Sequence, residues 1–499
     1  MTLPALDGIP EKLQALLTYD ASSPLIFSSG LFLFLFAGFM LVYSMFRRAP
    51  MARIVYVILF SLYFYYKSSG IYFLLLIFAA TSDYWIAKGI HAARSTRAKR
   101  WLVVLSVAVN LGMLAYFKYT NFLIDIANQM FGQGFMQFQN IFLPVGISFF
   151  VFQSMSYTID IYRGQLKPLD NWCDYLFYLS FFPQLVAGPI VRARDFIPQI
   201  RQNPIVVTRE MFGTGVFLIL TGLFKKAIIS DYISLNFVDR IFDEPLLYSG
   251  FECLAGIYGY ALQIYCDFSG YSDMAIGIAL LLGFRFPKNF DAPYKSATIT
   301  EFWRRWHISL STWLRDYLYI SLGGNRKGKL RTYGNLFITM LLGGLWHGAA
   351  VRFILWGALH GAALALHKLW LSVVPGAKVS GYQMHPLSRL AGILVTFHLV
   401  CFGWLLFRAD SMRTVQLMLH QITDNFHLQL LPQMLAGYGG VFALVGLGYL
   451  LHMLPGRADA AARRAVVASP FWVQVLLLAS VAWGVMQIQS SSIQPFIYF

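Results

Sequence analysis

One histidine of this chain lies within an apolar stretch. His347 follows the apolar run 337–342, is flanked by glycines at 343, 344 and 348, and is followed by a second apolar run that begins at Phe353. We expect His347 to lie at membrane depth, where an ionisable group is costly and by default indicates a functional site. An imidazole there can act as a general base, because an apolar environment favours its uncharged form. The glycines leave room for another group to approach the ring.

A second histidine, His307, lies in the densest polar segment, residues 285–335. Thr298 and Glu301 have the spacing of a capping box, which predicts a helix that begins at about Ile299 and continues through residue 318. On this helix one polar face would consist of Arg304, His307, Ser311 and Arg315. The neighbouring face would be apolar and would consist of Trp303, Trp306, Leu310, Trp313 and Tyr317. The pattern favours an amphipathic helix at the membrane surface, and the alternative is that its polar face lines a cavity leading to His347.

Two aspartates, Asp267 and Asp273, interrupt the apolar run 260–283. At membrane depth they must be paired or must face water. They could form a proton relay or an ion site. The favoured interpretation is a polar cluster that fixes helix packing through buried hydrogen bonds, because no matching half-site occurs elsewhere in the sequence.

Other motifs are too weak to indicate a site. Residues 323–329 have the spacing of a phosphate-binding loop, but Leu330 stands where Mg²⁺ ligation needs Ser or Thr. No G-x-S-x-G nucleophile elbow is present. The cysteines and histidines lack metal-site spacing, so we expect no metal site. Four further histidines in apolar runs are each better explained by packing, and these are His360, His367, His398 and His452.

The composition indicates a polytopic membrane protein. The chain has 499 residues, of which 58% are hydrophobic and only 12% are charged, whereas soluble proteins carry about 25% charged residues. The net charge is +16, but the basic residues cluster between apolar runs. This distribution favours loops at an anionic membrane surface over nucleic-acid binding.

The apolar runs predict an all-α fold with about eleven to thirteen membrane segments, some of them re-entrant. Basic clusters at 47–53 and 94–100 follow the first and third runs. By the positive-inside rule, these loops face the cytoplasm and the N-terminus faces outward. Beyond residue 190 the charges no longer decide the topology. We interpret residues 1–23 as an N-terminal amphipathic segment and residues 24–499 as one transmembrane domain.

The chain resembles the membrane-bound O-acyltransferase family, and most closely its alginate O-acetyltransferase-like branch. The most specific similarity lies in residues 271–277, 300–320, 322–326, 335–336 and 342–348, and weaker similarity lies in residues 143–149 and 187–189. Together the resemblance covers roughly residues 24–410. It implies a multi-helix fold around a tunnel open to both membrane sides, with a catalytic core at about 250–371.

The resemblance also implies the activity. The invariant histidine of the family corresponds to His347, and a second family position, His or Asn, corresponds to His307. The implied reaction is acyl transfer from a cytoplasmic donor, expected to be acetyl-CoA, across the membrane to an exported polysaccharide such as alginate or cellulose. A periplasmic or membrane-anchored acetyltransferase partner would complete the transfer at the bacterial inner membrane. Further candidates for lining the substrate and donor tunnel are Trp303, Arg304, Arg305, Trp306, Ser311, Asp316, Asn335 and Trp346.

Alternatives remain at this point. The acyl group could be D-alanine transferred to teichoic acid, although the segment 315–326 and the longer C-terminal part favour the alginate-like branch. A transporter for a small anion or a lipid-linked intermediate would suit broken helices and intramembrane charges, but no inverted repeat supports it. A non-catalytic assembly subunit of a secretion complex is the remaining possibility.

Overall fold

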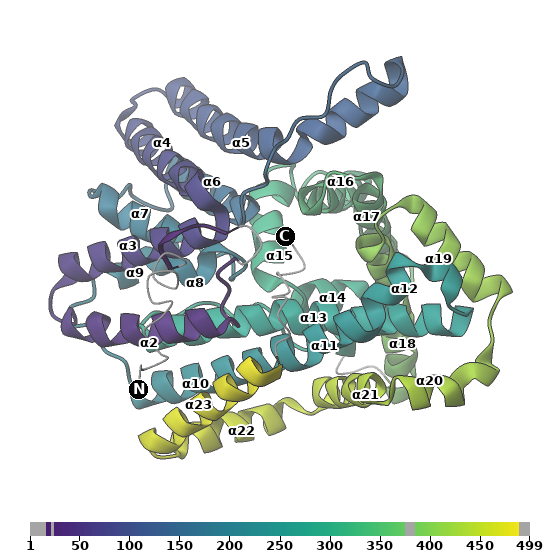
Figure 1. The fold of residues 1–499 in the computed structure, drawn as a ribbon. Helices are drawn as coiled ribbons and strands as arrows, with labels where there is room; N and C mark the ends of the chain where they lie inside the picture. Colours follow the sequence, from purple (N-terminus) through teal and green to yellow (C-terminus); the bar gives the residue numbers. More distant parts are fainter. Residues whose placement is uncertain (1–15, 21–23, 375–384, 489–499) are drawn as a thin grey trace.

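The computed structural model describes residues 16–20, 24–374 and 385–488, and within them all regular secondary structure is helical (Figure 1). The predicted all-α polytopic membrane fold is confirmed. Its N-terminal half consists of α2 (Gly30–Met45), α3 (Pro50–Ser69), α4 (Phe73–Ala92), α5 (Thr96–Phe131), α6 (Ile147–Tyr162), α7 (Trp172–Ser180), α8 (Phe182–Leu185), α9 (Ala193–Ile200), α10 (Arg209–Leu223), α11 (Asp231–Ile233) and α12 (Asp239–Asp243).

The C-terminal half begins with the long helix α13. It consists of α13 (Gly250–Leu281), α14 (Ile299–Arg305), α15 (Ile308–Trp313), α16 (Lys329–His347), α17 (Val351–Val373), α18 (Pro386–Arg408), α19 (Met412–Asp424), α20 (Leu431–Gly437), α21 (Gly439–Met453), α22 (Gly456–Ala468) and α23 (Phe471–Ile488). In Figure 1 the short helices α14 and α15 lie in the middle of the body, with α13 on one side and α16 and α17 on the other.

The pair α10 and α13 forms a tightly packed seam. A methyl group on Gly222 would lie 2.6 Å from the carbonyl oxygen of Gly270, and one on Gly277 would lie 2.6 Å from that of Gly215. The two glycine contacts are spaced seven residues apart on each helix, which brings the backbones together along a common face. This packing fixes α13, whose residues Phe268 and Ser272 reach the candidate site.

Five helical stretches of the described residues are long and apolar enough to cross a membrane, and up to seven if two bent helix pairs each count as one span. The sequence-based count of about eleven to thirteen segments also included shorter and re-entrant ones. Helices such as α6 and α7 have 16 and 9 residues, too few for a span, and most of their side chains are buried by other helices. Such segments are tolerated at membrane depth because surrounding protein satisfies their polar groups.

The predicted continuous helix over 299–318 is wrong at its centre. His307 has φ 42° and ψ 57°, a left-handed conformation that separates α14 from α15. The backbone there pairs with an extended segment instead: Ile308 N–H donates to the Asn289 carbonyl, and Asp291 N–H donates to the Arg305 carbonyl, both at 2.9 Å. These bonds replace helical ones, so the histidine lies at a kink and not on a regular polar face.

The predicted start of that helix is confirmed. Helix α14 begins at Ile299, and the Thr298 hydroxyl accepts a hydrogen bond from the Glu301 backbone N–H at 3.1 Å. The Glu301 carboxylate accepts from the Ala297 N–H at 2.9 Å, one residue before the N-cap. The cap fixes where α14 enters the site.

The predicted domain limits stay predictions. The N-terminal amphipathic segment, residues 1–23, lies mostly outside the described residues. The proposed catalytic core at 250–371 runs from α13 to α17 and holds both histidines of interest.

Candidate active site

Asn289 holds the imidazole of His307. The Asn289 side-chain oxygen accepts hydrogen bonds from the Ser309 backbone N–H at 3.1 Å and from the Ser309 hydroxyl at 2.9 Å. It lies 3.2 Å from His307 Nδ1. The Asn289 amide nitrogen donates to the Ser272 hydroxyl on α13 at 3.0 Å. All four residues are buried, so this network is shielded from solvent.

The network determines which nitrogen of His307 carries a proton. A backbone N–H can only donate, so the Asn289 atom facing Ser309 must be the carbonyl oxygen. That oxygen can only accept, so His307 Nδ1 carries the proton and donates to it. In the neutral ring Nε2 is then a proton acceptor. This Nε2 is buried and has no hydrogen-bond partner within the described part of the chain, which is the arrangement expected of an atom reserved for a substrate.

His347 is the last residue of α16, and aromatic rings surround it. Its ring centroid lies 4.8 Å from that of Trp346, 5.1 Å from that of Trp356 and 5.3 Å from that of Phe407, all in edge-on orientations. The side chain is half-buried. Such an apolar setting disfavours the imidazolium and keeps the ring available as a base.

Two consecutive residues of α5 bind the end of α16. The Lys118 ammonium donates to the Trp346 carbonyl, and the Tyr119 hydroxyl donates to the Leu345 carbonyl at 2.6 Å. Lys118 also lies 5.7 Å from the Trp346 ring centroid. The last four carbonyls of a helix have no partner inside it, and a cation there opposes the helix dipole favourably. Helix α5 therefore fixes the position from which His347 projects.

The two histidines lie in one cluster. The ring of Trp356 contacts both His347 and His360, with centroids 5.1 Å and 4.6 Å away. The ring of Phe149 on α6 joins the two parts, since its centroid lies 6.4 Å from His307 and 5.7 Å from Trp346. A cavity of about 270 Å³ adjoins this cluster, with Lys118, Ser148 and Phe149 in its lining.

The space beside the glycines around His347 is occupied by other residues of the protein. A methyl group on Gly344 would lie 2.2 Å from the Phe353 carbonyl oxygen and 2.9 Å from Cα of Gly357. One on Gly348 would overlap the Phe353 ring at 2.0 Å. The sequence suggested that these glycines leave space near the imidazole. In the structure that space accepts α17.

Three predicted tunnel residues are tryptophans, and all three are buried. Trp346 packs against Phe152 with stacked rings 5.2 Å apart. Trp303 donates its indole N–H to His360 Nδ1 at 3.3 Å. Trp306 lies 4.8 Å from Trp404 between ring centroids. Together these tryptophans form aromatic walls beside the two histidines.

The predicted polar tunnel residues of α14 and α15 make contacts that do not involve the two histidines. Arg304 is exposed. Arg305 forms ion pairs with Glu301 at 3.0 Å and with Asp291 at 3.6 Å, so it ties α14 to the preceding loop. The Ser311 hydroxyl donates to the Trp306 carbonyl at 3.2 Å and braces the kink.

Asp316 and Asn335 are also placed by structural contacts. Asp316 pairs with Arg192 at 2.7 Å and with Arg315 at 2.6 Å. The Asn335 amide donates to the Gly324 carbonyl at 2.9 Å. Asn335 and His347 are separated by about 18 Å along α16, at 1.5 Å per residue. Neither side chain is brought together with the two histidines by a described contact.

The two aspartates of α13 are paired with lysines. Lys226 lies 2.6 Å from Asp267 and 2.7 Å from Asp231, and Lys225 pairs with Asp273. The lysines lie in a π-helical segment, Phe224–Ser230, that continues α10. These pairs support the interpretation of the aspartates as a packing cluster, because each charge is matched by a neighbour.

Sequence reasoning missed three contributors to the site. Asn289 was included only in a proline-punctuated stretch, Lys118 directly follows the apolar run 101–117, and Trp356 lies in the apolar run 350–371 without a motif. Further apolar residues follow Lys118. A lysine at membrane depth is costly, and this is the one signal that could have identified Lys118.

A family model described as MBOAT, membrane-bound O-acyltransferase family, matches residues 170–402, a range that includes both histidines. A probable alginate O-acetylase of Pseudomonas aeruginosa is 43% identical over 395 residues, covering 78% of this chain and 73% of the relative. A probable alginate O-acetylase of Pseudomonas putida is 38% identical, covering 95% of this chain and 100% of the relative. A peptidoglycan O-acetyltransferase of Helicobacter pylori is 35% identical, covering 78% of each chain.

Proposed function

This chain belongs to the membrane-bound O-acyltransferase family, and we propose that it passes an acetyl group across the membrane for O-acetylation of an exported polysaccharide. The observation that carries the proposal is that the rings of Phe149 and Trp346 join His307 and His347, both inside the segment that the family model matches, into one aromatic cluster. Relatives named as O-acetylases of alginate and peptidoglycan support acetyl as the group transferred.

We propose that His347 is the general base. Acetyl transfer from a thioester to a hydroxyl forms a C–O bond and breaks a C–S bond, and the hydroxyl proton must leave. His347 takes this proton and returns it to the departing thiolate. A positioned base contributes about 10²- to 10⁴-fold to such a step. Acetyl-CoA is the proposed donor, and it enters as a substrate from the cytoplasmic side.

We propose that His307 positions a substrate. Its Nδ1 is held by Asn289, so Nε2 presents a fixed lone pair. That atom accepts a hydrogen bond from an N–H of the donor or from a second hydroxyl of the acceptor. Trp303, Trp306 and Trp346 shape the apolar surroundings, whereas Arg304, Arg305, Ser311, Asp316 and Asn335 support the elements that carry them.

The protein is a multi-pass membrane protein, and we place it in the bacterial inner membrane with its N-terminus outward. Membrane lipids are its surroundings, and the acceptor polysaccharide and a periplasmic or membrane-anchored acetyltransferase complete the pathway. D-alanyl transfer is the second candidate within the family, but the relatives that cover most of the chain bear acetylase names. A transporter or assembly role would require no base.

The test is His347→Ala, with His398→Ala as the matched control. His398 is exposed, lies in an apolar helix as His347 does, and contacts the Tyr258 hydroxyl at 2.9 Å. At equal membrane levels, we expect acetyl ester on the exported polymer to fall by at least about 10²-fold for His347→Ala and to persist for His398→Ala. Wild-type ester with His347→Ala would refute the catalytic assignment. Loss of polymer export, with ester per polymer unchanged, would favour the transporter.

A further inference from the structure

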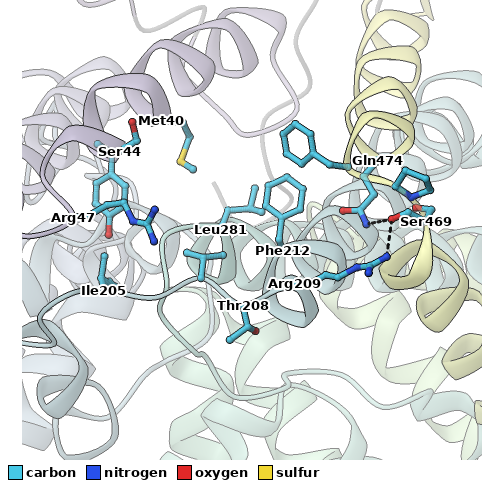
Figure 2. A pocket seen from close by; sticks show the side chains of 14 residues that line it. Met40, Ser44, Arg47, Ile205, Thr208, Arg209, Phe212, Leu281, Ser469 and Gln474 are labelled. Carbon is cyan, nitrogen blue, oxygen red and sulfur yellow. Dashed lines mark hydrogen bonds between the residues drawn. The ribbon is translucent and has the colours of Figure 1, made fainter.

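A cavity of about 600 Å³ lies away from the histidines, between the end of α2, the start of α10 and the turn that joins α22 to α23 (Figure 2). Its apolar lining includes Met40, Phe212 and Leu281. Its charged lining consists of Arg47 and Arg209, and none of the described lining residues is acidic. The cavity therefore combines an apolar floor with positive charge, which is the complement of an anionic amphiphile.

The helices around the cavity indicate its depth in the membrane. Helix α23 is apolar, and α22 meets it at 117°. No side chain of α22 is buried, and α22 carries Arg457, Arg463 and Arg464. If α23 enters the membrane, a helix at this angle lies along the surface, with its arginines near the headgroups. The cavity is at the corner between the two helices, where Ser469 and Phe471 line it.

The two arginines that line the cavity differ in their contacts. The Arg209 guanidinium donates to the Val467 carbonyl at 3.2 Å and to the Ala468 carbonyl at 2.7 Å, so it caps α22 and holds the corner. Figure 2 shows its further hydrogen bond to Ser469, at 3.5 Å. Arg47 is exposed, and its side chain makes no ion pair or hydrogen bond with any described residue. Figure 2 shows it extending from the turn after α2 into the space beside Leu281. Arg47 is therefore the cation available to a ligand.

We propose that this cavity binds an anionic glycerophospholipid of the surrounding leaflet, with the phosphate at Arg47 and an acyl chain on the floor formed by Met40, Phe212 and Leu281. A soluble phosphate would leave the apolar floor without a partner. A zwitterionic lipid would bring an ammonium group to a lining without any carboxylate. The site is independent of the acetyl-transfer chemistry, and its role is to fasten the α22–α23 corner to α2 and α10.

The experiment measures lipid retention by the full-length protein in mixed vesicles of phosphatidylglycerol and phosphatidylcholine, followed by native mass spectrometry. Arg47→Ala is compared with Arg48→Ala, because Arg48 is the next residue, is equally exposed and does not line the cavity. We expect wild type and Arg48→Ala to retain phosphatidylglycerol preferentially. Arg47→Ala should retain about fivefold less, the factor that corresponds to about 1 kcal/mol per basic residue near an anionic surface.

A second variant tests the apolar floor. Leu281→Gln should weaken retention of phosphatidylglycerol while leaving Arg47 in place. Equal retention of the two lipids by wild type would overturn the proposal, and so would equal loss of phosphatidylglycerol in Arg47→Ala and Arg48→Ala. Displacement of the lipid by inorganic phosphate without any dependence on Leu281 would also overturn it, because the site would then bind a free anion. Because the lipid site is independent of the acetyl-transfer chemistry, Arg47→Ala should keep wild-type acetyl transfer. A failure of the lipid proposal can therefore be told apart from a failure of the His347 assignment.

Discussion

The two histidine regions fix their imidazoles by different means. His307 is a residue in left-handed conformation between two short helices, and the hydrogen bond that its Nδ1–H donates to the Asn289 side-chain oxygen fixes the ring orientation. His347 lies at the end of the 19-residue helix α16, and its position follows from the helix end, which Lys118 and Tyr119 bind through backbone carbonyls. One ring is fixed directly, and the other is fixed through the backbone that carries it.

This difference predicts different responses to substitution. Where a ring is fixed by a hydrogen bond, removal of the partner frees the ring and changes its tautomer preference. Where a ring is fixed through a helix end, removal of a partner shifts the backbone slightly and leaves the ring chemistry intact. The first kind of change should therefore cost more activity than the second.

After His347→Ala, the largest effect should come from His307→Ala. Loss of the ring removes the positioned acceptor atom Nε2, and we expect the acetyl-transfer rate in isolated membranes to fall by about 10²-fold. His307→Asn should retain partial activity, because an amide oxygen can still accept a hydrogen bond. Complete loss in His307→Asn would show that an imidazole is required there, and the two histidines would then be alike in function.

The next effect should come from Asn289→Ala. It removes the Asn289 acceptor of the buried His307 Nδ1–H and leaves only the Ser309 hydroxyl, at 3.5 Å. Loss of the better acceptor costs about 1–3 kcal/mol and corresponds to roughly tenfold or more in rate if the ring reorients. Ser272→Ala is the matched control, since it removes the partner of the Asn289 amide nitrogen at 3.0 Å and leaves the bond to His307. We expect the transfer rate of Ser272→Ala to be much closer to wild type.

A double substitution sharpens the comparison. If Asn289 acts only through the ring of His307, then Asn289→Ala should cost little when added to His307→Asn. Additive losses in the transfer rate would show that Asn289 acts on the substrate by itself, and the proposed route through His307 would be wrong.

Some of this arrangement could be predicted from the sequence. Apolar composition and basic loops predicted a polytopic helical membrane protein, and the Thr298 cap predicted where α14 begins, because both are local signals. The packing of Asp267 was anticipated, since a carboxylate at membrane depth needs a partner. The partner itself, Lys226, lies 41 residues away and belongs to a π-helical segment, so no local pattern could identify it.

The break at His307 could not be predicted in the same way. Residues 299–318 have helical periodicity throughout, and His307 is neither glycine nor proline, the residues that usually mark a break. The left-handed conformation is stabilised by tertiary contacts, namely the pairing of 289–291 with 305–308 and the bond to Asn289. Such contacts join segments that are too far apart in the sequence for a local pattern to reveal. They determine the backbone conformation at His307 against the local preference for helix.

The membrane orientation of the later helices also depends on residues that are far apart in the sequence and lie together in the structure. The charges after residue 190 did not indicate an orientation, but the cavity lined by Arg47, Thr208, Arg209 and Ser469 places three connections at one end of the molecule. If the loop after α2 is cytoplasmic, as the positive-inside rule indicates, then α10 begins and α22 ends on that side as well.

A smaller effect than that of Asn289→Ala should come from Lys118→Met, which tests the helix end that carries His347. Methionine approximates the length and apolar stem of lysine but cannot donate to the Trp346 carbonyl or oppose the helix dipole. We expect kcat for acetyl transfer to fall by about threefold to tenfold, less than the full contribution of one charged hydrogen bond, because the contact acts on the ring only through the backbone. KM for acetyl-CoA should be unchanged, because the contact orients the base and does not bind the donor. Lys118→Arg should restore kcat, since arginine keeps both the charge and the donor.

Tyr119→Phe provides the matched comparison for Lys118→Met. It removes the neutral hydrogen bond to the Leu345 carbonyl, one residue further from His347, and leaves the charge at position 118. We expect a smaller fall in kcat than for Lys118→Met, at equal protein levels in the membrane. A loss in Lys118→Met as large as that of His347→Ala would mean that Lys118 acts on the reacting groups directly. A rise in KM with kcat unchanged would mean that it binds the donor, and the contrast between a ring fixed directly and a ring fixed through its helix would no longer hold.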